Sequence, residues 1–283
     1  MTGAKRKSRS SLATQLSLAP YSLWAALFIL VPLVFVAYYA FTDSEMRFTF
    51  DNIVSFFNTP EYMIIFWRSM KLAVISTLVC LLIGYPIAYI IARAAPRTQK
   101  TIITLIMIPM WMNFLLRTYA WMTILQDTGL LGSLLASIGL SRSHIFRTGT
   151  EAAVVIGMVY DYLPYMILPI YSIMAKMDDR LIEAAHDLGC NNVSTLRRVV
   201  FPLSLPGVIS GVTMVLIPSV STFYISQKLG NGMFFLIGDA IEEQHVRNNL
   251  HFAAAIAFIL MIILLIFMAL IRRYTDSRVQ GGV

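Results

Sequence analysis

Two charged side chains fall deep within largely apolar stretches of the sequence. Arg117 belongs to the stretch 101–125 and Asp161 to the stretch 151–174. An ionised group inside a lipid bilayer costs about 2.5–3.5 kcal/mol, which makes each of them a candidate functional residue. At about 1.5 Å per residue along a helix, the two lie at similar depths and are able to pair. Such a pair either locks two helices together or serves a solute pathway, and the two side chains alone leave both possibilities open.

The composition places these charges in a polytopic membrane protein. Of the 283 residues, 58% are hydrophobic and 13% are charged, and the mean hydropathy is +0.71. A soluble domain has about 25% charged residues. A soluble enzyme, a disordered chain and a nucleic-acid-binding domain are therefore excluded. The formal net charge of +7 instead reflects how the cytoplasmic loops of membrane proteins are charged.

Six apolar stretches are long enough to cross a bilayer as helices, which takes about 20 residues. We predict an all-α polytopic membrane protein whose six-helix transmembrane domain covers 21–273. A basic segment, 1–20, precedes this domain and a tail, 274–283, follows it. The predicted spans are 21–42, 67–92, 101–125, 151–174, 203–226 and 251–271.

The distribution of Lys and Arg indicates the orientation. With the N-terminus inside, 14 of these residues fall in inner segments and 7 in outer segments, which predicts that both termini are cytoplasmic. The stretch 21–42 is longer than the apolar region of a signal peptide and lacks a cleavage site, so we predict an uncleaved first helix. Neither Cys80 and Cys190 nor the four histidines have the spacing of a metal site, and we expect no metal and no cofactor.

The segment 175–202 is the longest predicted inner loop. Apolar residues at helical spacing predict a short amphipathic helix over 179–188, and Gly189 is expected to end it. Ser194 is expected to cap a second helix that runs into Pro202. Either the ends of the spans or another protein must cover the apolar face, and periodicity alone leaves both open. The spacing is carried by Leu181, Ile182, Ala185 and Leu188.

A longer pattern runs through the same loop. Glu-Ala-Ala at 183–185 is followed after three residues by Gly189, and after nine more by Val-x-Phe-Pro at 199–202. This spacing resembles the EAA motif of the permease subunits of bacterial ABC importers, in which Ile-x-Leu-Pro ends the pattern. Five further segments are similar to the polyamine permeases of spermidine/putrescine importers within this family. They are 84–89, 109–119, 163–166, 223–226 and 236–238.

The resemblance implies a fold, a location and a set of partners. The fold is the MetI-like permease fold in a bacterial cell membrane, with a cytoplasmic coupling helix that docks in a groove of an ABC ATPase dimer. A second, different permease subunit and an extracytoplasmic substrate-binding protein are also implied. The chain has no GxxxxGK[ST] phosphate loop, so ATP hydrolysis is expected on a separate subunit and not on this chain. The coupling residues implied by the motif are Glu183, Ala184, Ala185, Gly189 and Pro202.

The implied substrate is a thin chain that carries several ammonium groups. A pathway for it needs carboxylate, amide or hydroxyl acceptors and aromatic faces for cation–π contact. Arg117 has the wrong charge for direct contact and is assigned to orienting a carboxylate, and Trp121 is assigned to anchoring at the membrane interface. The candidate pathway residues are Trp111, Asn113, Arg117, Tyr160, Asp161, Tyr165, Ser221 and Tyr224.

The expected function is import of a polyamine by alternating access, driven by ATP on a partner subunit. Another solute, such as an anion or thiamine, stays open because the charge types discriminate weakly: Asp161 favours a cation, and Arg117 leaves an anion possible. A membrane-embedded enzyme would need clustered acidic or His residues at the bilayer surface, and the sequence offers none at useful spacing. A secondary transporter acting alone usually has more spans or internal symmetry, and it would leave the EAA motif unexplained.

Overall fold

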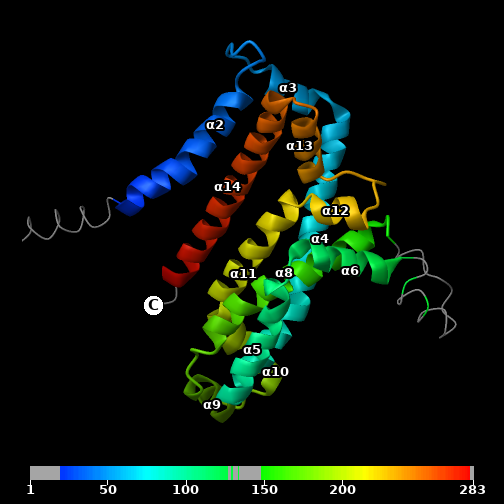
Figure 1. Ribbon diagram of the computed structural model, residues 1–283. Helices are drawn as coiled ribbons and strands as arrows, with labels where there is room; N and C mark the ends of the chain where they lie inside the picture. The colour runs from blue at the N-terminus through cyan, green and yellow to red at the C-terminus, as the bar shows by residue number, and fades with distance from the viewer. Residues whose placement is uncertain (1–19, 127–128, 130–132, 134–147, 281–283) are drawn as a thin grey trace, which may run out of the picture. The chain divides into compact units, whose positions relative to one another are not determined.

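The computed structural model describes residues 20–126, 129, 133 and 148–280 (Figure 1). The chain divides into two compact units, Met1–Thr59 with Gln244–Ile262 and Pro60–Glu243 with Ile263–Val283. Helices dominate the described residues, and the prediction of an all-α polytopic protein is confirmed. The predicted basic segment, apart from Pro20, and the last three residues of the predicted tail lie outside the described residues.

Five described helices are long and apolar enough to cross a membrane, and a bent pair of helices would make a sixth span. The helix Glu151–Met174 has the bounds of the predicted fourth span. The second begins at Pro60, earlier than predicted, because proline is favourable in a first helical turn. The fifth begins at Asn192, because the second helix of the 175–202 loop continues into it. The five are Pro20–Ala40, Pro60–Arg93, Glu151–Met174, Asn192–Ser221 and Leu250–Ile271.

The first unit contains the π-helix η1 (Ala26–Leu30), α2 (Val31–Ala40), α3 (Asp51–Asn58) and the N-terminal part of α14 (Leu250–Gln280). Just after the end of α2, Thr42 Oγ1 lies 3.2 Å from His251 Nδ1. Ala40 is the one buried residue of α2. Within this unit, most of the apolar side chains along α2 are exposed.

Three helices form the centre of the second unit: α4 (Pro60–Arg93), α8 (Glu151–Met174) and α11 (Phe201–Ser221). Apolar side chains from all three are buried between them, and they include Cys80, Ala88, Met166, Ile170, Val208 and Val215. Burial of this kind fixes the backbone of α8, which carries Asp161, against its two neighbours.

Two glycines let α11 approach α8 closely. Gly207 and Gly211 lie one turn apart on the face of α11 that meets α8. A Cβ atom at Gly207 would lie 2.9 Å from the carbonyl oxygen of Pro169, and one at Gly211 would lie 2.8 Å from the sulfur of Met166. Small residues at this spacing are typical of membrane helices packed backbone to backbone. This G-x-x-x-G pattern is present in the sequence but was not among the features used to predict the fold.

The predicted third span, 101–125, is not one helix. It consists of α5 (Pro96–Trp111) and α6 (Phe114–Leu125), which are bent by 92° with respect to each other. Met112 and Asn113 adopt extended backbone angles at the break, and the Asn113 side chain accepts a hydrogen bond from the Leu115 amide. Asparagine at this position is a favourable N-cap, so it starts a new helix instead of continuing the old one.

Two π-helical segments each precede a proline. The segment η1 comes just before Pro32, and η3 (Leu196–Val200) comes just before Pro202. Proline has no amide hydrogen, and its ring crowds the carbonyl four residues earlier, which in both cases lies inside the π-helix. Widening of the preceding turn accommodates the ring without ending the helix.

The 175–202 loop forms a helical elbow, by which we mean α9 (Arg180–Asp187), the turn at Gly189 and α10 (Asn192–Thr195) leading into η3. The predicted amphipathic helix is present, and Gly189 has a φ of +82° in the turn after it. The predicted cap was wrong. Asn191 caps α10, and its side chain accepts a hydrogen bond from the Ser194 amide. Asparagine competes well for the cap because its side-chain oxygen reaches amides two and three residues ahead.

The fifth span ends at Ser221, earlier than the predicted 226, because Thr222 is extended. Two short helices follow, α12 (Tyr224–Leu229) and α13 (Ile237–Val246). The start of α13 is tied to α4, because the Ile237 amide donates a 2.7 Å hydrogen bond to Ser69 Oγ.

Candidate functional site

Arg117 and Asp161 come together between α6 and α8. Arg117 Nη1 lies 3.4 Å from Asp161 Oδ1, and the two side chains are 10% and 5% exposed. Arg117 Nε and Asp161 Oδ1 are buried and have no hydrogen-bond partner among the described residues. An ion pair at this distance with unsatisfied polar atoms recovers only part of the cost of burying two charges. Removal of either partner would leave the other charge buried and unpaired.

The bend between α5 and α6 sets the position of Arg117. Because Asn113 starts α6, Arg117 follows one turn later, and its guanidinium lies 5.9 Å from the centre of the Phe114 ring. The break therefore brings a cation and an aromatic face to the same end of α6. A straight third span would have carried these side chains in another direction.

An aromatic cluster lies beside this end of α6. The Tyr224 ring is 5.6 Å from Phe114 and 6.4 Å from Tyr119, which it meets edge to face. The ammonium of Lys228 lies 5.5 Å from the centre of the Tyr119 ring and 5.6 Å from that of Tyr224. Both separations fall within the range of a cation–π contact, about 6 Å. The cluster already holds a cation.

A hollow of about 400 Å³ opens next to the aromatic cluster. Its walls combine apolar surface with four hydroxyl groups. One of them, that of Tyr162, donates a hydrogen bond to the Pro218 carbonyl, 3.4 Å away. We call this space the α6–α12 hollow. Its lining residues are Phe114, Leu115, Tyr162, Pro218, Ser221, Thr222, Phe223 and Tyr224.

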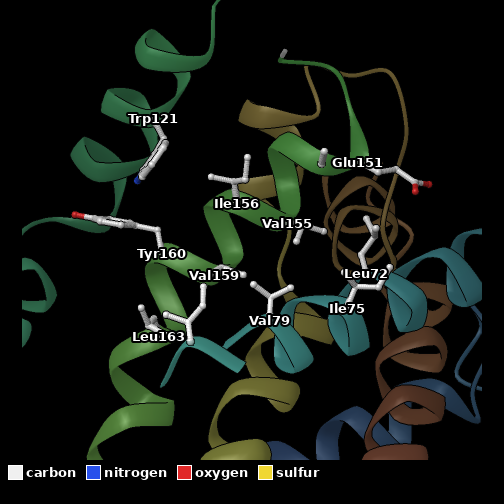
Figure 2. A pocket seen from close by; sticks show the side chains of 12 residues that line it. Leu72, Ile75, Val79, Trp121, Glu151, Val155, Ile156, Val159, Tyr160 and Leu163 are labelled. Atoms are coloured by element: carbon white, nitrogen blue, oxygen red, sulfur yellow. The ribbon is translucent and has the colours of Figure 1, made fainter. Parts of the chain in front are cut away.

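A larger and more apolar hollow of about 640 Å³ lies along α4 and α8 (Figure 2). Trp121 and Tyr160 meet edge to face at one wall, with their ring centres 5.2 Å apart. At the rim, Glu151 pairs with Lys71 at 2.5 Å and with Arg68 at 3.8 Å. Tyr160 therefore faces a different space from its neighbour in sequence, Asp161, and neither Arg117 nor Asp161 lines either hollow.

The remaining predicted pathway residues are dispersed. Trp111 ends α5 and is 76% exposed. The side-chain oxygen of Asn113 is engaged in capping α6. Tyr165 is 40% exposed, although the buried Asp161 lies one turn away on the same helix. Of the eight predicted residues, the structure brings together Arg117 with Asp161, and Ser221 with Tyr224.

The elbow presents the residues of the predicted coupling motif. Ala185 is buried, whereas Glu183 and Ala184 on the same helix are exposed. Leu188 and Val193, which flank the turn, are 86% and 73% exposed. At the base of the elbow, Arg93 at the end of α4 forms an ion pair with Asp179. The elbow is thus fixed at its base and offers apolar side chains at its tip.

Residues 84–281 match the model of the family described as "Binding-protein-dependent transport system inner membrane component". The chain belongs to this family. It is 36% identical over 253 residues to the spermidine/putrescine transport system permease protein PotB of Haemophilus influenzae, which covers 86% of this chain and 88% of that protein. The predicted resemblance to ABC importer permeases is confirmed, and the chain is a multi-pass membrane component of a transport system.

Solved permease structures share the fold. The permease resembles a chain of a bacterial alginate ABC transporter, solved with an alginate pentasaccharide-bound periplasmic protein, with a TM-score of 0.78 and 15% identity over 95% of this chain and 96% of that one. It resembles a chain of the MetNI methionine ABC transporter with a TM-score of 0.51 and 16% identity over 78% and 95% of the two chains. The predicted MetI-like permease fold is therefore confirmed.

Sequence reasoning on this permease missed Tyr119 and Lys228. Tyr119 lies within a segment quoted for its family resemblance, and Lys228 was counted only as a charge in an outer loop. Lys228 follows Tyr224 by four residues, which places both on one face of a helix. That spacing was available in the sequence, but α12 itself was not predicted.

Asp239 was also missed. It is 2% exposed in the first turn of α13, where its Oδ2 accepts a 2.7 Å hydrogen bond from the Leu236 amide. This contact is one half of a capping box. Burial raises the pKa of Asp239 from 3.8 to about 6, and the Leu236 amide opposes this rise.

Proposed function

We propose that this permease imports polyamines, spermidine and putrescine, by alternating access driven by ATP on a partner subunit. The observation that carries the proposal is the 36% identity to a PotB protein over 86% of this chain, because a match of that length includes the spans as well as the coupling motif. The inner-membrane setting comes from the family itself.

The geometry of the aromatic cluster supports a cationic substrate. Tyr119 and Tyr224 already lie around one ammonium group, and the α6–α12 hollow beside them offers hydroxyl groups among apolar walls. A polyamine alternates ammonium groups with methylene segments, which suit these two kinds of surface. In this proposal Ser221 and Tyr224 contact substrate, while the buried Arg117–Asp161 pair positions α6 against α8.

The elbow is assigned to coupling. Exposed apolar side chains at its tip fit a helix-in-groove contact with a cytoplasmic ABC ATPase dimer. This assignment puts both termini of the permease in the cytoplasm, in agreement with the excess of basic residues on that side. Glu183, Ala184, Ala185 and Gly189 would present and shape the contact, and Pro202 would direct the chain from the elbow into α11.

The proposal includes two further partners. A second, PotC-like permease would complete the pathway as a heterodimer, and an extracytoplasmic binding protein would deliver the polyamine. The exposed apolar surface of α2 is suited to contact with lipid or with such a second permease.

Reconstitution tests the proposal directly. The permease, a second permease and an ABC ATPase from the same organism are placed in liposomes that contain ATP, and the binding protein is added outside with radiolabelled spermidine or putrescine. We expect ATP-dependent accumulation of label, abolished when the phosphate-loop lysine of the ATPase is replaced. Because Arg117 and Lys228 are compatible with an anion, labelled small dicarboxylates are tested in the same assay, and labelled thiamine is tested as a different cation. Uptake of one of these in place of polyamines would overturn the proposal.

A further inference from the structure

Lys228 occupies the aromatic cluster by means of its own side chain. It lies near the C-terminal end of α12, one turn after Tyr224, and its ammonium is about equally far from the centres of the Tyr119 and Tyr224 rings, at 5.5 and 5.6 Å. Two helices thus contribute one ring each, and the cation comes from within the permease. The pair of rings is a site that binds an alkylammonium group.

Nothing else in the described structure neutralises this ammonium. In the part of the chain that the structure describes, no carboxylate lies within ion-pair distance of Lys228. The nearby Glu242 accepts a hydrogen bond from Gln227 instead, at 3.1 Å. A lysine held by aromatic faces on a flexible four-carbon stem is free to leave them without breaking an ion pair.

We propose that the Tyr119–Tyr224 pair is a substrate ammonium site which Lys228 fills in the absence of substrate, so that a polyamine binds by displacing the Lys228 side chain. The inference rests on the proposed function, because it takes the substrate to be a polyamine. It adds a specific site, and it identifies a residue of the permease as the competitor of its own substrate.

The surroundings fit the rest of such a molecule. Tyr224 belongs both to the ring pair and to the wall of the α6–α12 hollow, so a chain whose first ammonium replaces that of Lys228 can continue into this space. The ring of Phe114 and the ring of Pro218 offer apolar surface for methylene groups. The hydroxyl groups of Ser221 and Thr222 lie where a second ammonium would need acceptors.

Electrostatic repulsion predicts that the substrate ammonium replaces the Lys228 ammonium and does not bind beside it. Two ammonium groups on the same pair of rings would repel each other across a few ångströms. The substrate therefore gains the contacts that Lys228 loses. It binds the ring pair more weakly than it would if Lys228 did not occupy the rings. Removal of the Lys228 charge is expected to tighten substrate binding by about fivefold, the size of the loss of two exposed cation–π contacts.

A thiol in the hollow reports this exchange independently of transport. Ser221→Cys is introduced together with Cys190→Ser, the complete transporter is reconstituted without binding protein, and the concentration of spermidine that halves the rate of thiol alkylation is measured. Addition of Lys228→Met is expected to lower this concentration about fivefold. Lys228→Arg keeps a cation on the rings and is expected to leave it near or above the starting value. Tyr224→Leu is expected to raise it.

A matched control removes the same charge elsewhere. Lys100 is exposed near the start of α5, so Lys100→Met is expected to leave half-protection unchanged. The inference would be overturned if Lys228→Met left the half-protecting concentration unchanged or raised it. The proposed function would still stand in that case if the complete transporter took up spermidine. Absence of both uptake and protection in every variant would overturn both.

Discussion

The elbow and the buried ion pair lie in opposite settings, because the elbow exposes apolar side chains and the ion pair buries charged ones. At the elbow, Leu188 is 86% exposed and Val193 is 73% exposed, although both are apolar. Between α6 and α8, Arg117 and Asp161 are charged, and both are almost fully buried. Each arrangement is unfavourable for the isolated chain, because apolar surface is left in water in one case and charge is removed from water in the other.

The elbow and the ion pair differ in what offsets their unfavourable arrangement. The exposed apolar side chains of the elbow are stabilised only when another molecule covers them, as expected for a docking surface. The buried charges are stabilised chiefly by each other, and they line neither hollow. We therefore propose that the elbow acts on a partner outside the permease and that the ion pair acts within its fold. This contrast predicts large effects on folding at the pair and small ones at the elbow.

The largest effect is expected from breaking the ion pair. Asp161→Asn leaves the Arg117 charge buried with no counter-charge, and loss of one partner of a buried pair costs about 3–5 kcal/mol. We expect a strong fall in the amount of folded permease in the membrane. The measurement is the membrane level by immunoblot together with the melting temperature of the purified complex.

A double variant tests whether the pair is structural. Asp161→Asn with Arg117→Gln has no charge at either position, so the membrane level and the polyamine uptake per molecule are both expected to recover. If the level recovers and uptake per molecule does not, the pair belongs to the substrate pathway and the contrast drawn above fails.

Asp239 is a second buried carboxylate, and it provides a further test of how a buried charge affects stability. The pKa of Asp239 is raised by burial from 3.8 to about 6, so the folded permease binds this proton more tightly than the unfolded chain. The resulting stability is fully present below about pH 4 and is lost as the pH rises through about 6. At pH 7 the loss is about 3 kcal/mol, since each pKa unit corresponds to about 1.4 kcal/mol.

Asp239→Asn is expected to remove this dependence. The amide oxygen still accepts from the Leu236 amide, and no charge forms on deprotonation, so the melting temperature between pH 5 and 7 is expected to fall less than in the unaltered permease. Asp51 in the first turn of α3 is exposed, and Asp51→Asn is expected to keep the original slope. Parallel slopes for all three proteins would show that Asp239 does not titrate in this range.

Local features were predictable from the sequence, and features that depend on backbone bends were not. The elbow is encoded within one short segment, so periodicity and the glycine at 189 were enough to place α9 and its turn. The cap of α10 was misplaced because Asn191 and Ser194 are both good capping residues, and only the backbone decides between them.

The candidate substrate site needed tertiary structure. The similar depths of Arg117 and Asp161 could be estimated from the sequence, and the two do meet. The bend at Asn113 could not be seen in hydropathy, because apolar residues continue through it. Without that bend, Tyr119 and Lys228 have no reason to meet, and the pathway residues were assigned to a straight helix.

A smaller effect on stability is expected at the turn of the elbow. Gly189 has a φ of +82°, and a Cβ there would meet nothing within 4 Å, so Gly189→Val is opposed by backbone strain alone, about 1–2 kcal/mol. Gly232, between α12 and α13, has a φ of +69° and equally open surroundings. Gly232→Val therefore imposes similar strain away from the elbow. We expect both variants to reach the membrane and only Gly189→Val to lose ATP-driven uptake; equal uptake would remove the elbow from coupling.

The smallest effect on stability is expected at the tip of the elbow, where Leu188 is the most exposed large apolar side chain. Leu188→Ser removes apolar surface from water and is expected to change the melting temperature of the isolated permease by no more than a surface substitution does, about 0.5 kcal/mol in free energy. In a groove of the ATPase the same leucine would be buried, and its loss would cost about 1.5–3 kcal/mol of binding. Copurification of the ATPase with the permease is therefore expected to fall at least tenfold. Val246 at the end of α13 is 76% exposed, and Val246→Ser is expected to leave copurification unchanged. If Leu188→Ser instead lowers the melting temperature of the permease alone and leaves ATPase binding intact, the leucine packs within the fold and the elbow is not the docking surface.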